Sequence, residues 1–147
     1  VKKGNPFNIK TIEDCINDDS VRLVLANPEA ASIGKFTKNV LLQSQLWDKV
    51  ARKVTVMKPT VNDVANTIKI DAADVGIAWD VISNQYDALD FVELKEFNDK
   101  SKTVTLGLLV SSLKKQISMD FANYMISIDK GQKTLKDFGY KLIDEKG

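Results

Sequence analysis

The feature that most constrains the fold is a regular alternation of short apolar runs and helical patterns. The runs 21–26, 53–57 and 74–79 have the length and the β-branched content of buried strands. Between these runs, apolar residues recur at helical spacing, in the sets Ile33, Phe36, Val40, Trp47 and Val61, Val64, Ala65, Ile68. A β-α-β-α-β order predicts an α/β fold with a mainly parallel sheet and crossover helices.

The residues that flank this alternation predict further elements. Thr11 followed by Asp14 predicts a capping box that opens a short helix over 11–17. A fourth strand is expected over 89–97, since apolar and polar residues alternate there.

The last third of the sequence has a different character. A long apolar strand is expected over 103–113, followed by a helix from about 113 to 128. One face of this helix carries Ile117, Phe121, Tyr124, Met125 and Ile128. Gly139 is expected to end a final helix.

Composition excludes several classes of site. The chain has 147 residues, of which 44% are hydrophobic, and a formal net charge of +1. It is therefore long enough for one globular domain with a core, and it lacks the basic surplus of a nucleic-acid groove. Without histidine, a His-dependent catalytic triad and the usual zinc site are not expected. Cys15 is expected to be a small buried side chain rather than a reactive thiol.

A parallel sheet directs attention to the turns beyond the carboxyl ends of its strands, where ligands bind. These turns are 27–34, 58–62 and 79–82. Exposed backbone N–H groups at a helix start can hold an anion. Proline and small residues are also ordinary turn formers, and for 27–34 alone that explanation is favoured.

Four segments carry a resemblance to a known family, and they are 1–15, 22–50, 60–80 and 119–142. In this order they resemble the carboxyl-terminal part of the periplasmic molybdate/tungstate-binding proteins of ABC transporters, within the type II solute-binding fold. The resemblance implies a hinge segment at 1–10 and an oxyanion-binding second lobe at 11–102. Residues 103–147 would be a return strand and closing helices that pack on a first lobe absent from this chain.

The resemblance also implies a ligand site, made of Ser32, Ile33, Gly34, Val61, Asn62 and Trp79. Ile33 and Val61 match residues whose backbone N–H groups contact the oxyanion. Trp79 matches a tyrosine whose hydroxyl contacts the ligand, so the indole is a departure from the family pattern, and a packing role for Trp79 stays open. Asn62 either caps its helix or faces water.

Charged neighbours of this site have expected positions as well. Glu29 should point away from the site, because an inward carboxylate would repel an anion, and Lys35 should be a solvated helix residue. The implied ligand is molybdate or tungstate, with no cofactor and no metal held by protein side chains.

The function implied is capture of a tetrahedral oxyanion for a membrane ABC permease, in the periplasm or another extracytoplasmic space. The unusual start at Val1 leads us to expect a processed or truncated product without its signal peptide. Two alternatives stay open, namely an enzyme acting on another small anion and a ligand-sensing regulatory domain. Because the first lobe is missing, the apolar closing elements are expected to self-associate or to fold back on the chain's own sheet.

Overall fold

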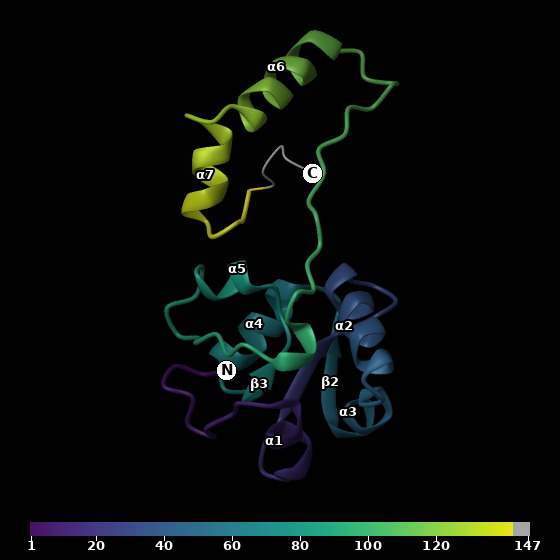
Figure 1. Ribbon diagram of the computed structural model, residues 1–147, viewed down its shortest axis with the longest axis vertical. Helices are drawn as coiled ribbons and strands as arrows, with labels where there is room; N and C mark the ends of the chain where they lie inside the picture. Colours follow the sequence, from purple (N-terminus) through teal and green to yellow (C-terminus); the bar gives the residue numbers. More distant parts are fainter. Residues whose placement is uncertain (143–147) are drawn as a thin grey trace. The chain divides into compact units, whose positions relative to one another are not determined.

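Three parallel strands form the sheet of this protein, in the order β2-β1-β3 (Figure 1). They are β1 (Leu23–Ala26), β2 (Val54–Lys58) and β3 (Val75–Gly76). The computed structural model describes residues 1–142. The α/β fold with a parallel sheet is thus confirmed, although the third strand is much shorter than the predicted run 74–79.

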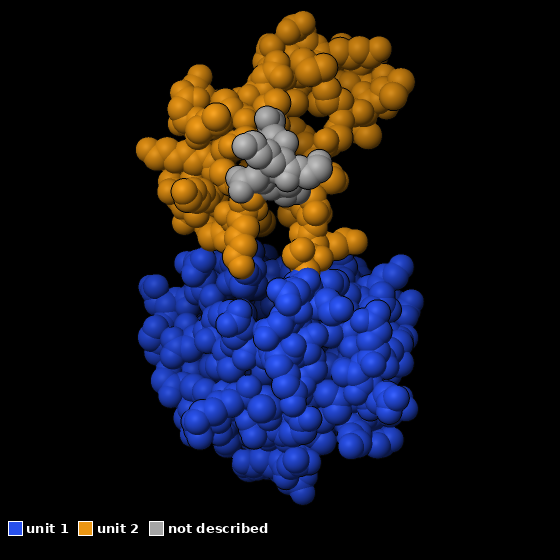
Figure 2. Space-filling view, viewed as in Figure 1, with its two compact units in different colours: residues 1–100 blue, residues 101–147 orange. Residues whose placement is uncertain are grey.

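Two compact units make up the chain, Val1–Lys100 and Ser101–Gly147 (Figure 2). The sheet lies in the first unit, with the helices α1 (Ile12–Asn17), α2 (Ser32–Gln43), α3 (Trp47–Lys53), α4 (Val61–Lys69) and α5 (Asp80–Ser83). The hinge expected at 1–10, the second lobe at 11–102 and the closing elements at 103–147 stay predictions.

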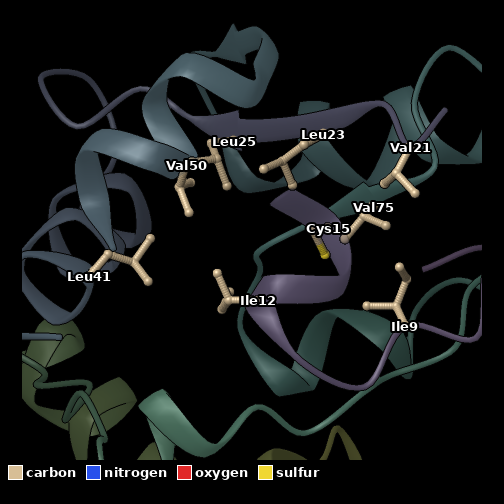
Figure 3. Packing of buried hydrophobic residues seen from close by; sticks show 9 residues of the cluster. All are labelled: Ile9, Ile12, Cys15, Val21, Leu23, Leu25, Leu41, Val50 and Val75. Carbon is tan, nitrogen blue, oxygen red and sulfur yellow. The ribbon is translucent and has the colours of Figure 1, made fainter. Parts of the chain in front are cut away.

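The main core cluster lies between one face of the sheet and the helices α1, α2 and α3 (Figure 3). Its members are Ile9, Ile12, Cys15, Val21, Leu23, Leu25, Leu41, Val50 and Val75. Side chains alternate between the faces of a strand, so Val24 points to the opposite face, which α4 covers. All four residues of β1 are buried, because helices cover both faces of the central strand.

Cys15 is a member of this cluster. Its side chain is buried, and burial raises the pKa of its thiol to about 11. The prediction of a small buried side chain is confirmed.

The capping box predicted at Thr11 is confirmed. The Asp14 N–H donates to Thr11 Oγ1 at 3.1 Å, and the Thr11 N–H donates to the Asp14 carboxylate at 2.8 Å.

The helical spacing of Ile33, Phe36, Val40 and Trp47 predicts a single helical pattern, but the structure has two helices there. The first helix, α2, ends at Gln43, and Trp47 opens the separate helix α3. Gln45 between them has a φ of 58°, which a right-handed helix cannot include. Trp47 therefore lies at helical spacing from Val40 by coincidence, since the two residues belong to different helices.

The fourth strand expected over 89–97 is wrong as well. Only an isolated antiparallel bridge between Lys2 and Leu89 and the 3-10 turn η1 (Lys95–Phe97) occur there. Leu94 and Phe97 pack against the core cluster without joining the sheet. Packing, rather than strand pairing, accounts for their apolar spacing.

The second unit contains α6 (Lys115–Ile126) and α7 (Gly131–Asp137). The strand expected over 103–113 is absent from the described residues, because a strand needs a neighbour to accept its backbone hydrogen bonds and none pairs with it. The helix expected from about 113 to 128 is present with closer limits, which leave Ile128 outside it.

Gly139 ends α7 as predicted. It has a φ of 91°, its N–H donates to Lys136 O at 2.9 Å, and the Tyr140 N–H donates to Leu135 O at 3.0 Å. These two bonds form a Schellman motif, which requires the left-handed conformation that glycine adopts most easily.

Candidate anion-binding site

Two helix starts lie beyond the same edge of the sheet. Ala26 at the end of β1 pairs with Lys58 at the end of β2, and the next residue, Asn27, donates its N–H to Lys58 O at 2.7 Å. Because these strands are parallel neighbours, α2 and α4 both begin beyond their carboxyl ends. The predicted common edge for the turns at 32–34 and 60–62 is confirmed.

The start of α2 has free backbone donors. Its N-cap residue, Ala31, has no side chain that can accept a hydrogen bond. The first i to i−4 hydrogen bond of the helix runs from the Lys35 N–H to Ala31 O at 3.1 Å. Within residues 1–142, the N–H groups of Ser32, Ile33 and Gly34 therefore have no acceptor, as expected for an uncapped first turn.

Gly34 allows this first turn to approach the end of β1. A Cβ atom at position 34 would lie 2.4 Å from Ala26 O and 2.6 Å from the carbonyl carbon of Asn27. No other residue fits such a close backbone contact. The family resemblance implies Gly34 as a site residue, and the structure adds this packing requirement.

The start of α4 is capped at one donor only. Thr60 Oγ1 accepts the Asp63 N–H at 3.1 Å and donates to Asp63 Oδ2 at 2.7 Å. Thr60, and not Asn62, is therefore the cap, while Asn62 is exposed and faces water. Among the described residues, the N–H groups of Val61 and Asn62 have no acceptor.

Trp79 belongs to an aromatic cluster. It is the N-cap residue of α5, and its ring centroid lies 5.2 Å from that of Phe36 in α2. Phe36 in turn lies 6.2 Å from Phe97 in η1. Trp79 therefore has a packing role beyond the end of β3. Its ring is half-buried, and its indole N–H has no acceptor in the described part of the chain.

The neighbouring charges are placed as expected. Lys35 is exposed, and the Glu29 side chain is 86% exposed, with its Oε1 3.9 Å from Lys38 Nζ. Neither residue contributes a buried charge to the two helix starts.

Two carboxylates in the first turns were missed by the sequence reasoning. Asp63 is held by Thr60, and Asp80 Oδ1 accepts the N–H of Val81 at 3.0 Å. Acidic residues are common in first turns because they complement the helix dipole, so their positions were readable from the sequence. Their negative charges repel a dianion bound close by. The local hydrogen bonds that both carboxylates accept weaken this repulsion.

The arrangement suits an acceptor-only ligand. Two adjacent helix starts offer free backbone donors from Ser32, Ile33, Gly34, Val61 and Asn62. Such donors carry partial positive charge without a full counter-charge, which is favourable for an oxyanion.

The chain is similar to known proteins in sequence and in fold. The family model described as bacterial extracellular solute-binding protein matches residues 1–141. A protein of Bacillus subtilis (strain 168), by its assigned name an ABC transporter substrate-binding lipoprotein, YvgL, is 24% identical over 125 residues. That alignment covers 83% of this chain and 46% of the relative, so the chain spans about half of the relative's length.

Two solved structures share the fold. The first is the substrate-binding domain assigned to a molybdenum ABC transporter from Clostridium difficile, at 22% identity and a TM-score of 0.67, covering 95% of this chain and 61% of that one. The second is a crystal structure of PEB3 bound to L-phospholactate, at 18% identity and a TM-score of 0.68, covering 97% of this chain and 63% of that one.

Among the described residues, none of the helices combines the length and apolar content needed to cross a bilayer.

Proposed function

Because this chain belongs to the family of bacterial extracellular solute-binding proteins, we propose that it is part of the substrate-binding component of an ABC transporter. Its ligand would be a tetrahedral oxyanion held at the starts of α2 and α4. The observation that carries this proposal is the set of free backbone donors at two helix starts on one sheet edge.

The ligand-contacting residues in this proposal are Ser32, Ile33, Gly34, Val61, Asn62 and Trp79. Ile33 and Val61 would donate through the backbone, and Trp79 would donate through its indole N–H. The branched side chain of Ile33 is buried in the core and does not disable the backbone donor.

Molybdate or tungstate is the proposed oxyanion. The name of the Clostridium difficile domain supports a molybdenum oxyanion, and the donor-only helix starts suit a fully deprotonated tetrahedral ion. The PEB3 structure holds an organic phosphate in the same fold, so the choice of anion needs a direct comparison. The protein would need no cofactor, and the metal atom would be part of the ligand itself.

The remaining parts of the proposal follow from the family. Residues 1–10 would form a hinge, 11–102 the second lobe, and 103–147 the elements that pack on a first lobe. The complete protein would work in the periplasm or another extracytoplasmic space, where it would deliver its ligand to an ABC permease.

The enzyme and the regulatory domain are less well supported. The matched relatives are named as substrate-binding proteins, and their names describe no reaction and no regulatory role. The two helix starts supply hydrogen-bond donors, and the nearby carboxylates of Asp63 and Asp80 are held in local hydrogen bonds, whereas general acid–base catalysis would need a free, positioned proton acceptor.

Calorimetry with four anions tests the choice of ligand in a protein that carries this chain together with a first lobe. We expect molybdate and tungstate to bind tightly and phosphate to bind poorly. A protonated phosphate oxygen needs an acceptor, the free backbone groups of these turns are donors, and the nearby carboxylates of Asp63 and Asp80 are held in local hydrogen bonds. Sulfate is a deprotonated tetrahedral dianion like molybdate but is smaller, so its affinity shows the effect of ion size at equal charge. Phosphate binding as tightly as molybdate would refute the proposed selectivity.

A further inference from the structure

Lys58 is the residue at which β2 ends, directly before the turn into α4. Its backbone O accepts the Asn27 N–H at 2.7 Å, which ties the end of β2 to the turn before α2. Lys58 pairs with Ala26, and paired residues of a parallel sheet face the same side. Because Ala26 lies two residues after Val24, the Lys58 side chain lies on the face of the sheet that α4 covers.

The ammonium of Lys58 has no internal partner. Within residues 1–142 four lysines are half-buried, and Lys58 is one of them. The other three have a carboxylate or carbonyl oxygen next to Nζ, namely Lys2 with Asp71, Lys38 with Glu29 and Lys53 with Asp18. For Lys58 the described residues provide neither an ion pair nor a hydrogen-bond acceptor. A half-buried charge without such a partner is unfavourable.

The place of this charge is unusual as well. Lys58 precedes Val61, the first residue of α4, by three positions, and α2 begins beyond the same sheet edge. Helix starts carry partial positive charge, so they repel a cation and attract an anion. The carboxylates of Asp63 and Asp80 are held in local hydrogen bonds, and neither pairs with Lys58. An anion bound at the two helix starts would compensate all three positive groups at once.

We infer that Lys58 sets the charge preference of the proposed oxyanion site, and this inference rests on the proposed function. The backbone donors suit any tetrahedral acceptor of the right size. The attraction of an ammonium group, by contrast, is proportional to the charge of the ligand. Lys58 therefore favours a dianion such as molybdate or tungstate over a monoanion of the same shape.

Perrhenate is the probe that isolates this effect, because it is tetrahedral and similar in size to molybdate but carries one negative charge instead of two. NMR titrations of the ¹⁵N-labelled 147-residue chain with sodium molybdate and sodium perrhenate, at constant ionic strength, give both affinities. K58M should weaken molybdate binding about tenfold and perrhenate binding about threefold, because the lost Coulomb energy is proportional to the charge of the ligand.

Two further variants separate Lys58 from general surface charge. K58R keeps the positive charge and should keep the preference for molybdate. K35M is the matched control, since Lys35 is an exposed lysine near the start of α2, and it should change either affinity by no more than about twofold. A loss in K35M equal to that in K58M would overturn the inference.

The unfolding temperature without ligand provides an independent test. K58M removes an unpartnered ammonium, so its unfolding temperature should equal or exceed that of the natural sequence. A clear decrease would mean that Lys58 has a structural partner, and would overturn the premise.

The titrations also distinguish the two ways in which the account can fail. If molybdate shifts none of the amides at the two helix starts of the natural sequence, the proposed function fails and the inference fails with it. If those amides respond but K58M keeps the natural ratio of molybdate to perrhenate affinity, only the inference about Lys58 fails.

Discussion

At the scale of single residues, Gly34 is the position where the fold and the proposed site depend most directly on one another. Its missing side chain lets the first turn of α2 touch the end of β1, with Ala26 O 2.4 Å from the place of a Cβ atom. The free donors of α2 are held at the sheet edge by this contact.

Gly34→Ala should therefore destabilise the first unit by about 1–3 kcal/mol, the usual cost of overpacking. Urea denaturation, followed by the fluorescence of Trp47 and Trp79, measures the change. Gly107→Ala is a matched control, since nothing lies within 4 Å of a Cβ atom at that position. If G34A were as stable as the natural sequence, the close approach would be wrong.

Asp74 is a second residue with a predictable effect. Its side chain is 4% exposed, and Arg22 contacts both its oxygens, with Nη2 2.7 Å from Oδ1 and Nε 2.9 Å from Oδ2. Hydrogen bonding to this guanidinium holds the pKa of the Asp74 carboxyl below its usual value.

Since the folded pKa is lowered, the stabilisation by Asp74 is fully present above the unfolded value of about 3.9 and is lost as pH falls through the lower folded value. Asp14, Asp18, Asp71 and Asp90 have lowered pKa values too and contribute in the same direction. Asp74→Asn should reduce the acid-dependent part of the unfolding free energy. Thermal melts at a series of acidic pH values measure it, and an unchanged slope in the variant would contradict the assignment.

At the scale of elements, the sequence predicted what local chemistry determines. The capping box at Thr11, the alternating strands and helices, and the glycine stop at Gly139 depend on neighbours within a few residues. The ranges 89–97 and 103–113 were predicted as strands, and they failed because a strand requires a partner that periodicity does not reveal.

The candidate site was predictable to the same extent. The common edge of the two helix starts followed from the order of the strands. The close approach at Gly34 and the contact of Trp79 with Phe36 depend on three-dimensional packing, so the spacing of residues alone did not reveal them. The cap at Thr60 is a local contact with Asp63, and its spacing in the sequence could have revealed it, as it did at Thr11.

Proline substitutions can remove single donors from this site without breaking a helix. Ser32 and Val61 are the first residues of α2 and α4, a position where proline is favoured. The residues before them, Ala31 and Thr60, already have the extended backbone that proline requires.

We expect S32P and V61P each to weaken oxyanion binding by roughly ten- to a hundredfold, since a hydrogen bond to a charged group contributes about 1.5–3 kcal/mol. The controls S32A and V61A lose the same side chains and keep the N–H groups. Calorimetry on a protein with both lobes compares each pair. Equal affinities for the proline and alanine variants would exclude these N–H groups as ligands.

At the scale of the whole molecule, the exposed apolar side chains of the second unit are the main unexplained surface. Within residues 101–142 only Gly131 is buried. The large exposed side chains of the predicted helix face are Ile117, Phe121, Tyr124 and Ile128. A soluble protein seldom exposes such a surface unless something covers it.

The isolated 147-residue chain should therefore self-associate through residues 103–142 or bury them on its own sheet. Light scattering over a range of concentrations tests self-association, and a symmetric dimer is the simplest expected product. If the chain stayed monomeric, resistance of this region to protease would indicate that it folds back. Ready cleavage of a monomer there would contradict both forms of the prediction.

The central claim is that the backbone donors at the starts of α2 and α4 hold an oxyanion. The most direct measurement is an NMR titration of the ¹⁵N-labelled 147-residue chain with sodium molybdate, because amide shifts detect the weak binding expected of one lobe. We predict that the largest shifts occur at the amides of Ser32, Ile33, Gly34, Val61 and Asn62. Shifts confined to other regions, or no response at these five amides to molybdate or tungstate, would contradict the account.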